Sequence, residues 1–277
     1  MPRPLALLPV AVAICATAAW SQSTREPAWP DIAASVWDGR ALQDGSGLIT
    51  IDAPVRTMDD ARTRIAARAD APRGDALVRV SLILDENPMP VSAVFDLVQP
   101  QPAFFFDVTF RVNGPTPLHV VAETASGALL VAQGYVKTSG QGACSAPPGT
   151  DPEAALATLG DMELALSALG GTAATDPGQA LEALVAQERQ LDIDISHPSH
   201  SGMQMDQISL LFIPMRFVES VDVALDGAPF AAVTGSISLS ENPSLSLSVP
   251  GGTRSADVEM TDTDGTVTRA HTALAGF

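Results

Sequence analysis

Cysteine and positive charge are both scarce in this 277-residue chain. It has two cysteines, Cys15 and Cys144, and 15 Lys plus Arg against 32 Asp plus Glu, which gives a net charge of −17. So few positive charges argue against nucleic acid or an anionic membrane surface as a partner, because both require basic patches. The composition instead fits an acidic exported protein.

The motifs of several enzyme classes are also missing. The sequence has no Walker A loop, no dinucleotide-binding glycine motif, no His-Glu-x-x-His and no paired zinc cysteines. A Cys–His hydrolase pair is formally available, since there are four histidines, but no motif places a His, an orienting acid and an oxyanion hole together. We therefore expect a protein that is not an enzyme and that needs no cofactor.

The start of the chain predicts a secretory signal peptide over residues 1–21. A basic residue, Arg3, precedes an apolar run from Leu5 to Ala19, and small and polar residues follow it. The run is too short for a membrane span. Cys15 follows Ile14, whereas a lipidated cysteine follows a small residue, so we expect Cys15 to leave with the signal. The expected location is the periplasm, with no membrane attachment after cleavage.

Short apolar segments alternate with turn signals about every ten residues, which favours an all-β fold of two immunoglobulin-like β-sandwiches. Trp29–Gln43 is expected to form a short helix or an arm, and Thr57–Asp70 fits a helix or a strand equally well. The expected strands are Leu48–Ile51, Ala76–Leu84, Val91–Val98, Ala103–Arg111, Leu118–Thr124, Leu129–Lys137, Leu191–Ile195, Gln207–Ile213, Arg216–Leu225, Phe230–Ser238, Ser244–Val249, Ala256–Thr261 and Thr266–Ala273.

A short helical connector is expected between the two sandwiches, over residues 150–190. Asp151-Pro152-Glu153 supplies an N-cap, a first-turn proline and a first-turn acid. Apolar residues at helical spacing follow, namely Leu156, Leu159, Met162, Leu166 and Leu169, and Asp176-Pro177 repeats the start signal before Leu181, Leu184 and Val185. The first sandwich then spans residues 29–149 and ends in the loop that holds Cys144, and the second spans 191–277.

Cys144 is the candidate site residue. It lies in a stretch rich in Gly, Ser and Pro, Lys137–Pro148, which is typical of an exposed loop rather than of a core strand. An accessible thiol can attack, hold and release an adduct. Two other interpretations remain open: a free thiol without function, or a buried core residue. Lys137 is the only lysine, but nothing in the sequence places its ammonium beside the sulfur.

Two histidines and two methionines near the start of the second sandwich form a weak candidate metal site. His197, His200, Met203 and Met205 lie within nine residues, and these ligand types suit copper. The alternative is that His197-Pro198 is a turn between strands and that the methionines pack at the interface of the two sandwiches. No metal is expected on balance.

The second sandwich resembles SoxZ of the bacterial sulfur-oxidising (Sox) system, and the first is similar to SoxY. For SoxZ, the resemblance rests on Ile195-Ser196-His197-Pro198, Gly202, Ile213-Pro214, Phe217-Val218, Glu241-Asn242-Pro243 and Asp262-Thr263-Asp264-Gly265. For SoxY, it rests on Asp85-Glu86-Asn87-Pro88-Met89-Pro90 and on the strand that ends at Lys137 and runs into a Gly-rich segment with a cysteine. One chain with both halves is similar to the fused SoxYZ-like carriers associated with quinoprotein (PQQ-dependent) dehydrogenases.

The resemblance implies a carrier. In that family two immunoglobulin-like sandwiches pair, and a cysteine on a glycine-rich arm holds sulfur intermediates for periplasmic redox enzymes. Cys144 is the position here that takes this role, within Gly142-Ala143-Cys144-Ser145 in place of an all-glycine setting. Ala and Ser restrict the backbone more than Gly does, so a stiffer arm is expected. The competing hypothesis is a non-covalent accessory protein of a quinoprotein dehydrogenase or its cytochrome.

Overall fold

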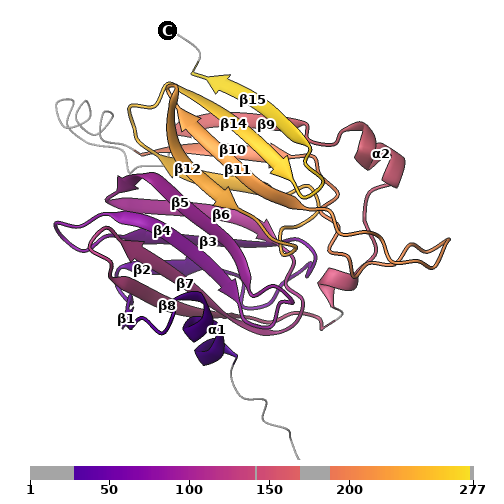
Figure 1. Ribbon diagram of the computed structural model, residues 1–277, viewed down its shortest axis with the longest axis horizontal. Helices are drawn as coiled ribbons and strands as arrows, with labels where there is room; N and C mark the ends of the chain where they lie inside the picture. The colour runs from indigo at the N-terminus through magenta and orange to yellow at the C-terminus, as the bar shows by residue number, and fades with distance from the viewer. Residues whose placement is uncertain (1–27, 141, 169–187, 275–277) are drawn as a thin grey trace, which may run out of the picture.

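A computed structural model describes residues 28–140, 142–168 and 188–274 (Figure 1). The described chain is nearly all β, which confirms the predicted fold class. The expected signal peptide, and the second helix start at Asp176 with Leu181, Leu184 and Val185, lie outside the described residues. No helix within the described ranges is long and apolar enough to cross a membrane.

In its described part, the first half of the chain forms one helix and eight strands. Trp29–Gln43 opens with a helix, as expected, and Thr57–Asp70 resolves in favour of a strand at its C-terminal part. The elements are α1 Trp29–Val36, β1 Leu42–Asp44, β2 Ile49–Asp52, β3 Thr63–Asp70, β4 Leu77–Leu84, β5 Val91–Gln101, β6 Ala103–Phe110, β7 Thr116–Thr124 and β8 Leu129–Val136.

Two short helical segments and seven strands follow in the described remainder of the chain. The elements are η1 Ala143–Ser145 (a 3-10 turn), α2 Pro152–Ala157, β9 Met162–Ala168, β10 Arg189–Ile195, β11 Val218–Leu225, β12 Ala228–Thr234, β13 Ser244–Val249, β14 Ser255–Asp262 and β15 Val267–Ala273.

The predicted connector helix is wrong beyond Ala157. Its start is confirmed, because the Asp151 carboxylate accepts the backbone N–H groups of Glu153 and Ala154. Gly160, however, adopts a left-handed φ of +82°, and Met162–Ala168 is a strand that pairs antiparallel with β10. The spacing of Met162 and Leu166 fits a helical face, but the free edge of β10 offers a full ladder of backbone hydrogen bonds instead.

The predicted strand over Gln207–Ile213 is also wrong. This stretch forms the tip of a loop that projects from the molecule, drawn in orange at the right of Figure 1. Isolated bridges between His200 and Arg216 and between Met205 and Phe212 hold the sides of the loop together. Leu210 adopts a left-handed φ of +59°, which a strand does not allow.

The two halves share both of their sheets. One sheet has the strand order β1-β8-β7-β4-β5-β12-β11-β14-β15, and the other has the order β2-β3-β6-β13-β10-β9, counted over the described residues. The halves join where β5 pairs with β12 and where β6 pairs with β13, both antiparallel. The SoxY-like and SoxZ-like halves of one chain are therefore paired with each other, as Figure 1 shows in its lower and upper parts.

The core lies between the two sheets and runs through both halves. In β6, inward and outward residues alternate, so that Phe104, Phe106 and Phe110 are buried while Phe105 is partly exposed. The ring of Phe95 on β5 stacks on Phe106 with centroids 4.5 Å apart. These two strands are also the ones that pair with the second half, so this stacked pair of rings lies at the junction of the halves.

Candidate functional site

Cys144 is buried rather than exposed, which corrects the expectation of an accessible loop. Its residue surface is 0% exposed, and it is the free cysteine of the described chain. The turn η1 that holds it begins after Gly142, whose left-handed φ of +72° favours glycine. Composition predicted a loop correctly, but it did not predict that other parts of the fold cover this loop.

Polar groups from both halves hold the Cys144 segment, which we define as residues 142–150. The backbone N–H of Cys144 donates to Asn113 Oδ1 at 3.1 Å, and the carbonyl of Cys144 accepts from the buried Ser201 hydroxyl. Gln204 Nε2 donates to the carbonyl of Ala146 at 3.0 Å. The middle of the segment is therefore fixed by β6–β7 on one side and by the projecting loop on the other.

Two carboxylates fix the chain on either side of this turn. Upstream, Asp60 Oδ2 accepts the backbone N–H of Ser139 at 2.9 Å. Downstream, the Glu241 carboxylate accepts the N–H groups of Gly149 and Thr150, each at 2.8 Å. The segment is thus tethered at both ends, and its reach beyond the surface is shorter than that of a free arm.

Arg111 is the cation that acts on the thiol, not Lys137. Arg111 is 2% exposed, and its Nη1 donates to the carbonyls of Ser199 and Leu239, each at 2.6 Å. Burial raises the pKa of the Cys144 thiol to about 11, and the charge of Arg111 opposes this rise without cancelling it. Burial likewise lowers the pKa of Arg111, against the opposing effect of Cys144 and Glu241. In this state the thiol is protonated and unreactive near neutral pH.

A cavity of about 250 Å³ opens beside the Cys144 segment. Its lining brings residues of both halves together: Asp59, Ala61, Arg62, Arg111, Ala143, Ala146, Pro147, Gly149, Thr150, Gln204, Glu241 and Asn242. Arg62 donates to the carbonyls of Glu241 and Asn242 at 2.8 and 2.7 Å. The cavity therefore combines two guanidinium groups with the residues on either side of Cys144.

The candidate metal ligands differ in burial and in their hydrogen-bond partners. His197 is buried, its Nδ1 accepts the N–H of Ser199 at 2.9 Å, and its Nε2 lies 3.4 Å from Asp262 Oδ2. Burial lowers the pKa of His197 to about 4, so its ring is neutral near neutral pH. His200 contacts Gln204 Oε1 at 3.2 Å, and Met205 is exposed on the projecting loop. No group of three or more His, Cys, Asp or Glu side chains within the described ranges is arranged to hold a metal ion.

Residues of the quoted sequence motifs meet in space. Asn242 and His197 bond reciprocally, because Asn242 N donates to the His197 carbonyl at 2.8 Å and His197 N donates to Asn242 Oδ1 at 2.9 Å. Asn87 is buried, donates to the Arg111 carbonyl at 2.8 Å, and accepts the N–H of Asn113 at 2.9 Å. The turn that contains Asn87 thus supports Asn113, which in turn binds the backbone of Cys144.

Sequence reasoning missed Arg111, Asn113, Ser201 and Gln204 as residues that hold Cys144. Each lies 31 to 60 positions from Cys144 in the sequence, and Ser201 and Gln204 belong to the second half. No spacing pattern connects them to the cysteine. Asn87 and Glu241 were quoted only as parts of short motifs. Their roles as supports of the Cys144 segment follow from the fold alone.

The projecting loop carries apolar side chains at its tip. Its base holds the Cys144 segment through Ser201 and Gln204, whereas its tip is exposed to solvent. The exposed members are Met205, Ile208, Leu210, Leu211, Phe212 and Met215, and Ile208 is 95% exposed. Monomeric proteins seldom expose such clusters, which often mark contact surfaces for other proteins.

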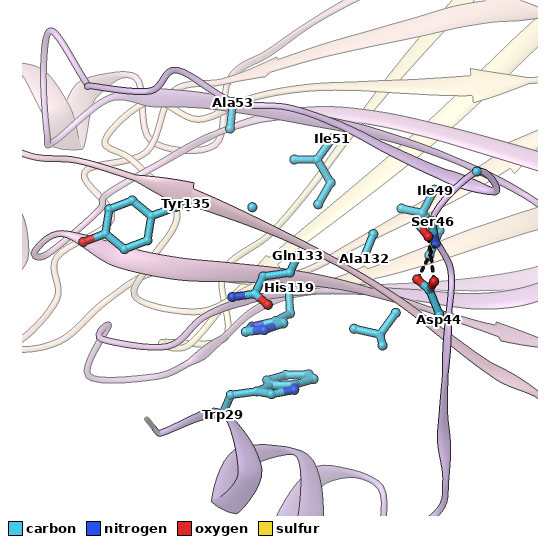
Figure 2. A pocket seen from close by; sticks show the side chains of 13 residues that line it. Trp29, Asp44, Ser46, Ile49, Ile51, Ala53, His119, Ala132, Gln133 and Tyr135 are labelled. Carbon is cyan, nitrogen blue, oxygen red and sulfur yellow. Dashed lines mark hydrogen bonds between the residues drawn. The ribbon is translucent and has the colours of Figure 1, made fainter. Parts of the chain in front are cut away.

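A second cavity, of about 630 Å³, lies in the first half and away from the candidate thiol (Figure 2). Trp29 of α1 lines it and stacks on His119, with ring centroids 3.6 Å apart and an interplanar angle of 7°. His119 Nδ1 lies 3.0 Å from Asp85 Oδ1, and the other Asp85 oxygen is buried without a hydrogen-bond partner among the described groups. Its lining includes no residue of the Cys144 segment.

Comparison with protein-family models identifies both halves. The model described as sulfur oxidation protein SoxY matches residues 33–144, and the model described as sulphur oxidation protein SoxZ matches residues 181–273. The first match ends at Cys144. Together the two ranges span most of the chain. A search of curated proteins finds no match.

Solved structures also resemble parts of the chain. The chain is similar to the sulfur carrier protein SoxY from Chlorobium limicola f thiosulfatophilum, with 23% identity and a TM-score of 0.33 over 40% of this chain and 96% of that one. It is also similar to a superoxide reductase (neelaredoxin) from Ignicoccus hospitalis, with 13% identity and a TM-score of 0.27 over 32% of this chain and 78% of that one. Both scores are low, so the assignment to a family rests on the two family models.

Proposed function

This chain joins a SoxY domain to a SoxZ domain and so belongs to the sulfur-oxidation carrier family, and we propose that it holds a sulfur-containing intermediate covalently on Cys144. The observation that carries the proposal is the position of Cys144, which is the free cysteine of the described chain and the last residue of the SoxY match. The protein passes its cargo between partner redox enzymes and catalyses no turnover of its own. With residues 1–21 removed on export, it works in the periplasm.

Loading by thiol–disulfide-type exchange needs no external oxidant. The Cys144 thiolate attacks a sulfane sulfur of a donor such as tetrathionate, one S–S bond forms, and the donor's S–S bond breaks. The departing thiosulfate takes the electron pair. Loading of sulfide or thiosulfate itself releases two electrons, and these must go to an electron acceptor such as a cytochrome partner. Both routes need the thiolate, which the buried state suppresses.

The buried state of Cys144 therefore acts as a resting state that must open before loading. Three hydrogen bonds hold the middle of the segment to the rest of the fold: one from the Cys144 N–H, one to its carbonyl, and one to the carbonyl of Ala146. Each such bond contributes about 1 kcal/mol net, so release of the segment is within reach of a partner's binding energy. The anchors at Ser139 and at Gly149 limit the released loop to shallow clefts.

The proposed partners are periplasmic redox enzymes, either of the Sox type or a quinoprotein dehydrogenase with its cytochrome. The apolar tip of the projecting loop offers a contact surface, and the base of the same loop binds the Cys144 segment. A partner that docks on the tip therefore displaces the loop that keeps the thiol buried. The net charge of −17 favours partners with a basic face.

A second function is favoured by one observation, the complete burial of Cys144 with its raised pKa. Under this alternative the chain is a non-covalent accessory protein of a quinoprotein dehydrogenase system, and the thiol is a packed residue without a chemical role. The two functions differ in one consequence: Cys144→Ser abolishes function in a carrier and leaves it intact in an accessory protein.

The test is the intact mass of the mature protein, purified from the periplasm without reductant, before and after dithiothreitol. A reversible increase on the wild-type chain that is absent from Cys144→Ser supports the carrier, and its size identifies the cargo. Incubation with tetrathionate should add one S₂O₃ group to the wild-type chain alone. An unmodified thiol that resists tetrathionate even at alkaline pH would favour the accessory protein.

A further inference from the structure

Arg111 is a buried cation without a carboxylate partner among the described residues. No described Asp or Glu oxygen lies within ion-pair distance of its guanidinium, and its side-chain hydrogen bonds run from Nη1 to two backbone carbonyls. Nε and Nη2 donate to no described group, and neither belongs to the buried atoms without a partner, which are Asp85 Oδ2 and Thr268 Oγ1, so these two donors are not fully enclosed. A buried charge costs free energy unless an opposite charge compensates it. In a chain with 32 acidic residues, an unpaired buried arginine points to an anion that is supplied from outside.

Arg111 lines a cavity rather than an exposed surface patch. The cavity of about 250 Å³ is lined by Arg111 together with Ala143 and Ala146, which flank Cys144 and Ser145. Arg111 lies close enough to Cys144 for its charge to act on the thiol. Cys144 itself is not among the lining residues, so an adduct on its sulfur reaches this guanidinium only if the cavity wall at Ala143 and Ala146 gives way.

The acidic residues of the cavity wall are engaged elsewhere. Glu241 accepts the N–H groups of Gly149 and Thr150, and Asp59 Oδ1 accepts the N–H of Ala61 at 2.9 Å. Glu241 acts on Arg111 through its charge but makes no ion pair with it in the described chain. Arg62 adds a second guanidinium, whose bonds go to the carbonyls of Glu241 and Asn242 and to the Ser244 hydroxyl.

We propose that this cavity is an anion-binding site that receives the charged end of an adduct on Cys144, with Arg111 as the residue that selects an oxyanion such as a sulfonate. Guanidinium groups bind tetrahedral and planar oxyanions through paired, charge-assisted hydrogen bonds. The inference rests on the proposed carrier function and adds what that function lacks, a selection of cargo by charge. A carrier with an anionic adduct would return to the closed state and protect it, whereas a neutral adduct would leave Arg111 uncompensated.

Charge-matched synthetic adducts test the site without the natural cargo. The reagents are 2-sulfonatoethyl, 2-hydroxyethyl and 2-(trimethylammonium)ethyl methanethiosulfonate. In each case the Cys144 thiolate attacks the thiosulfonate sulfur, a disulfide to the ethyl group forms, and methanesulfinate leaves with the electron pair. The measurement is the rate at which dithiothreitol releases each adduct, relative to the same adduct on glutathione, which corrects for the reagents' own reactivity.

In the wild-type protein, the corrected release of the sulfonate adduct should be slower than that of the hydroxyethyl adduct by about tenfold or more. The trimethylammonium adduct should be released fastest. Arg111→Met should remove the difference, Arg111→Lys should restore part of it, and Arg40→Met, whose guanidinium pairs with Glu123 elsewhere, should leave it unchanged. Equal corrected rates for the three adducts in the wild-type protein would overturn the proposal.

The outcomes separate this site from the carrier function. The synthetic adducts report on Arg111 even if the purified protein carries no natural cargo, in which case only the carrier function fails. A natural adduct together with equal release rates would leave the carrier standing and remove the anion site. If Arg111→Met does not fold, the comparison of the three adducts on the wild-type chain still decides.

Discussion

Arg111 and Arg216 lie in the same molecule, but of these two only Arg216 has carboxylate partners within the described chain. Arg216 Nε donates to Asp262 Oδ2 at 2.8 Å and lies 3.3 Å from Asp264, and its Nη2 donates to Thr266 Oγ1 at 2.7 Å. Arg111 has two carbonyls and no carboxylate among the described residues. In the first cluster the charge of Arg216 is compensated by carboxylates of the chain itself, and the cluster holds the turn at the end of β14. The second is left one negative charge short, and it stands beside the only described cysteine.

The comparison distinguishes a buried charge that stabilises the fold from a buried charge that is available for function. Asp262 is fully buried and is also bonded by the backbone N–H groups of Asp264 and Thr266. Burial tends to raise the pKa of Asp262, but the Thr266 N–H and Arg216 outweigh this effect and leave the pKa lowered. The cluster needs nothing from outside. Perturbed groups that lack an internal partner are the better candidates for chemistry.

The largest expected effect is the loss of stability in Arg216→Met. This change leaves the Asp262 carboxylate buried without its cation, and we expect the free energy of unfolding to fall by about 3 kcal/mol. Arg111→Met removes a buried cation that has no carboxylate partner, so relief of desolvation offsets the two lost hydrogen bonds, and the expected loss is about 1 kcal/mol or less. Urea unfolding of both variants measures the difference. Equal losses would break the distinction between the two arginines.

The second prediction concerns pH. Alkaline pH should affect the Cys144 segment, and acid should affect the cluster around Arg216. The buried Cys144 thiol has a pKa raised from 9.0 to about 11, so the thiol holds its proton more tightly in the buried state than in the released state. The buried state of the Cys144 segment is therefore most stable below pH 9. Its equilibrium constant relative to the released state falls by up to about a hundredfold as the pH rises from 9 to about 11. Alkylation of Cys144 by iodoacetamide should show a midpoint shifted toward pH 11.

The Arg216 cluster should respond to acid instead. The pKa of His197 is lowered from 6.5 to about 4, so the unfolded chain takes up this proton first and stability falls as pH drops through that window. Protonation of Asp262 weakens the fold further at lower pH, because its pKa is lowered as well. Urea unfolding at a series of pH values measures the loss of stability from protonation of His197 and of Asp262. A loss of stability with acid in His197→Gln as large as in the wild-type chain would contradict the assignment.

The smallest effect is expected from single contacts of the Cys144 segment. Gln204→Ala removes the bond to the Ala146 carbonyl, which should release the segment about fivefold to tenfold more often and raise the rate of thiol labelling by the same factor. Gln99→Ala is the matched control, because Gln99 Nε2 donates to the Pro229 carbonyl at 2.9 Å at an exposed site away from the cysteine. The same labelling rate in both variants would show that Gln204 does not keep the thiol buried.

Much of the fold could be predicted from the sequence because strand alternation is a local property. The alternation of β6 and the two-proline turn after β4 are visible in a few neighbouring residues. β9 was missed because Leu156, Met162 and Leu166 fit a helical face equally well, and the edge of β10 that decides the matter lies beyond residue 188. The Gln207–Ile213 stretch is apolar enough to predict a strand, but within the described chain its pairing is limited to the isolated bridge of Phe212 with Met205.

The site could be predicted only in part. Cys144 was singled out by its rarity and by the composition around it. Its burial could not be predicted, because the groups that cover it, such as Asn113 and Gln204, are brought to it by the pairing of the two halves. Arg111 was seen only as the end of a strand. A cation is recognised as unpaired only when every neighbour is known, and this knowledge requires the fold.

The pairing of β5 with β12 and of β6 with β13 has a consequence for how this carrier behaves on dilution. Two separate chains would dissociate when their concentration falls below the dissociation constant of the pair. Here both partners belong to one polypeptide, so the second half is always present at the high effective concentration set by the covalent link. Each molecule therefore carries Cys144 and the half that covers it in a fixed one-to-one ratio, however few copies the cell makes.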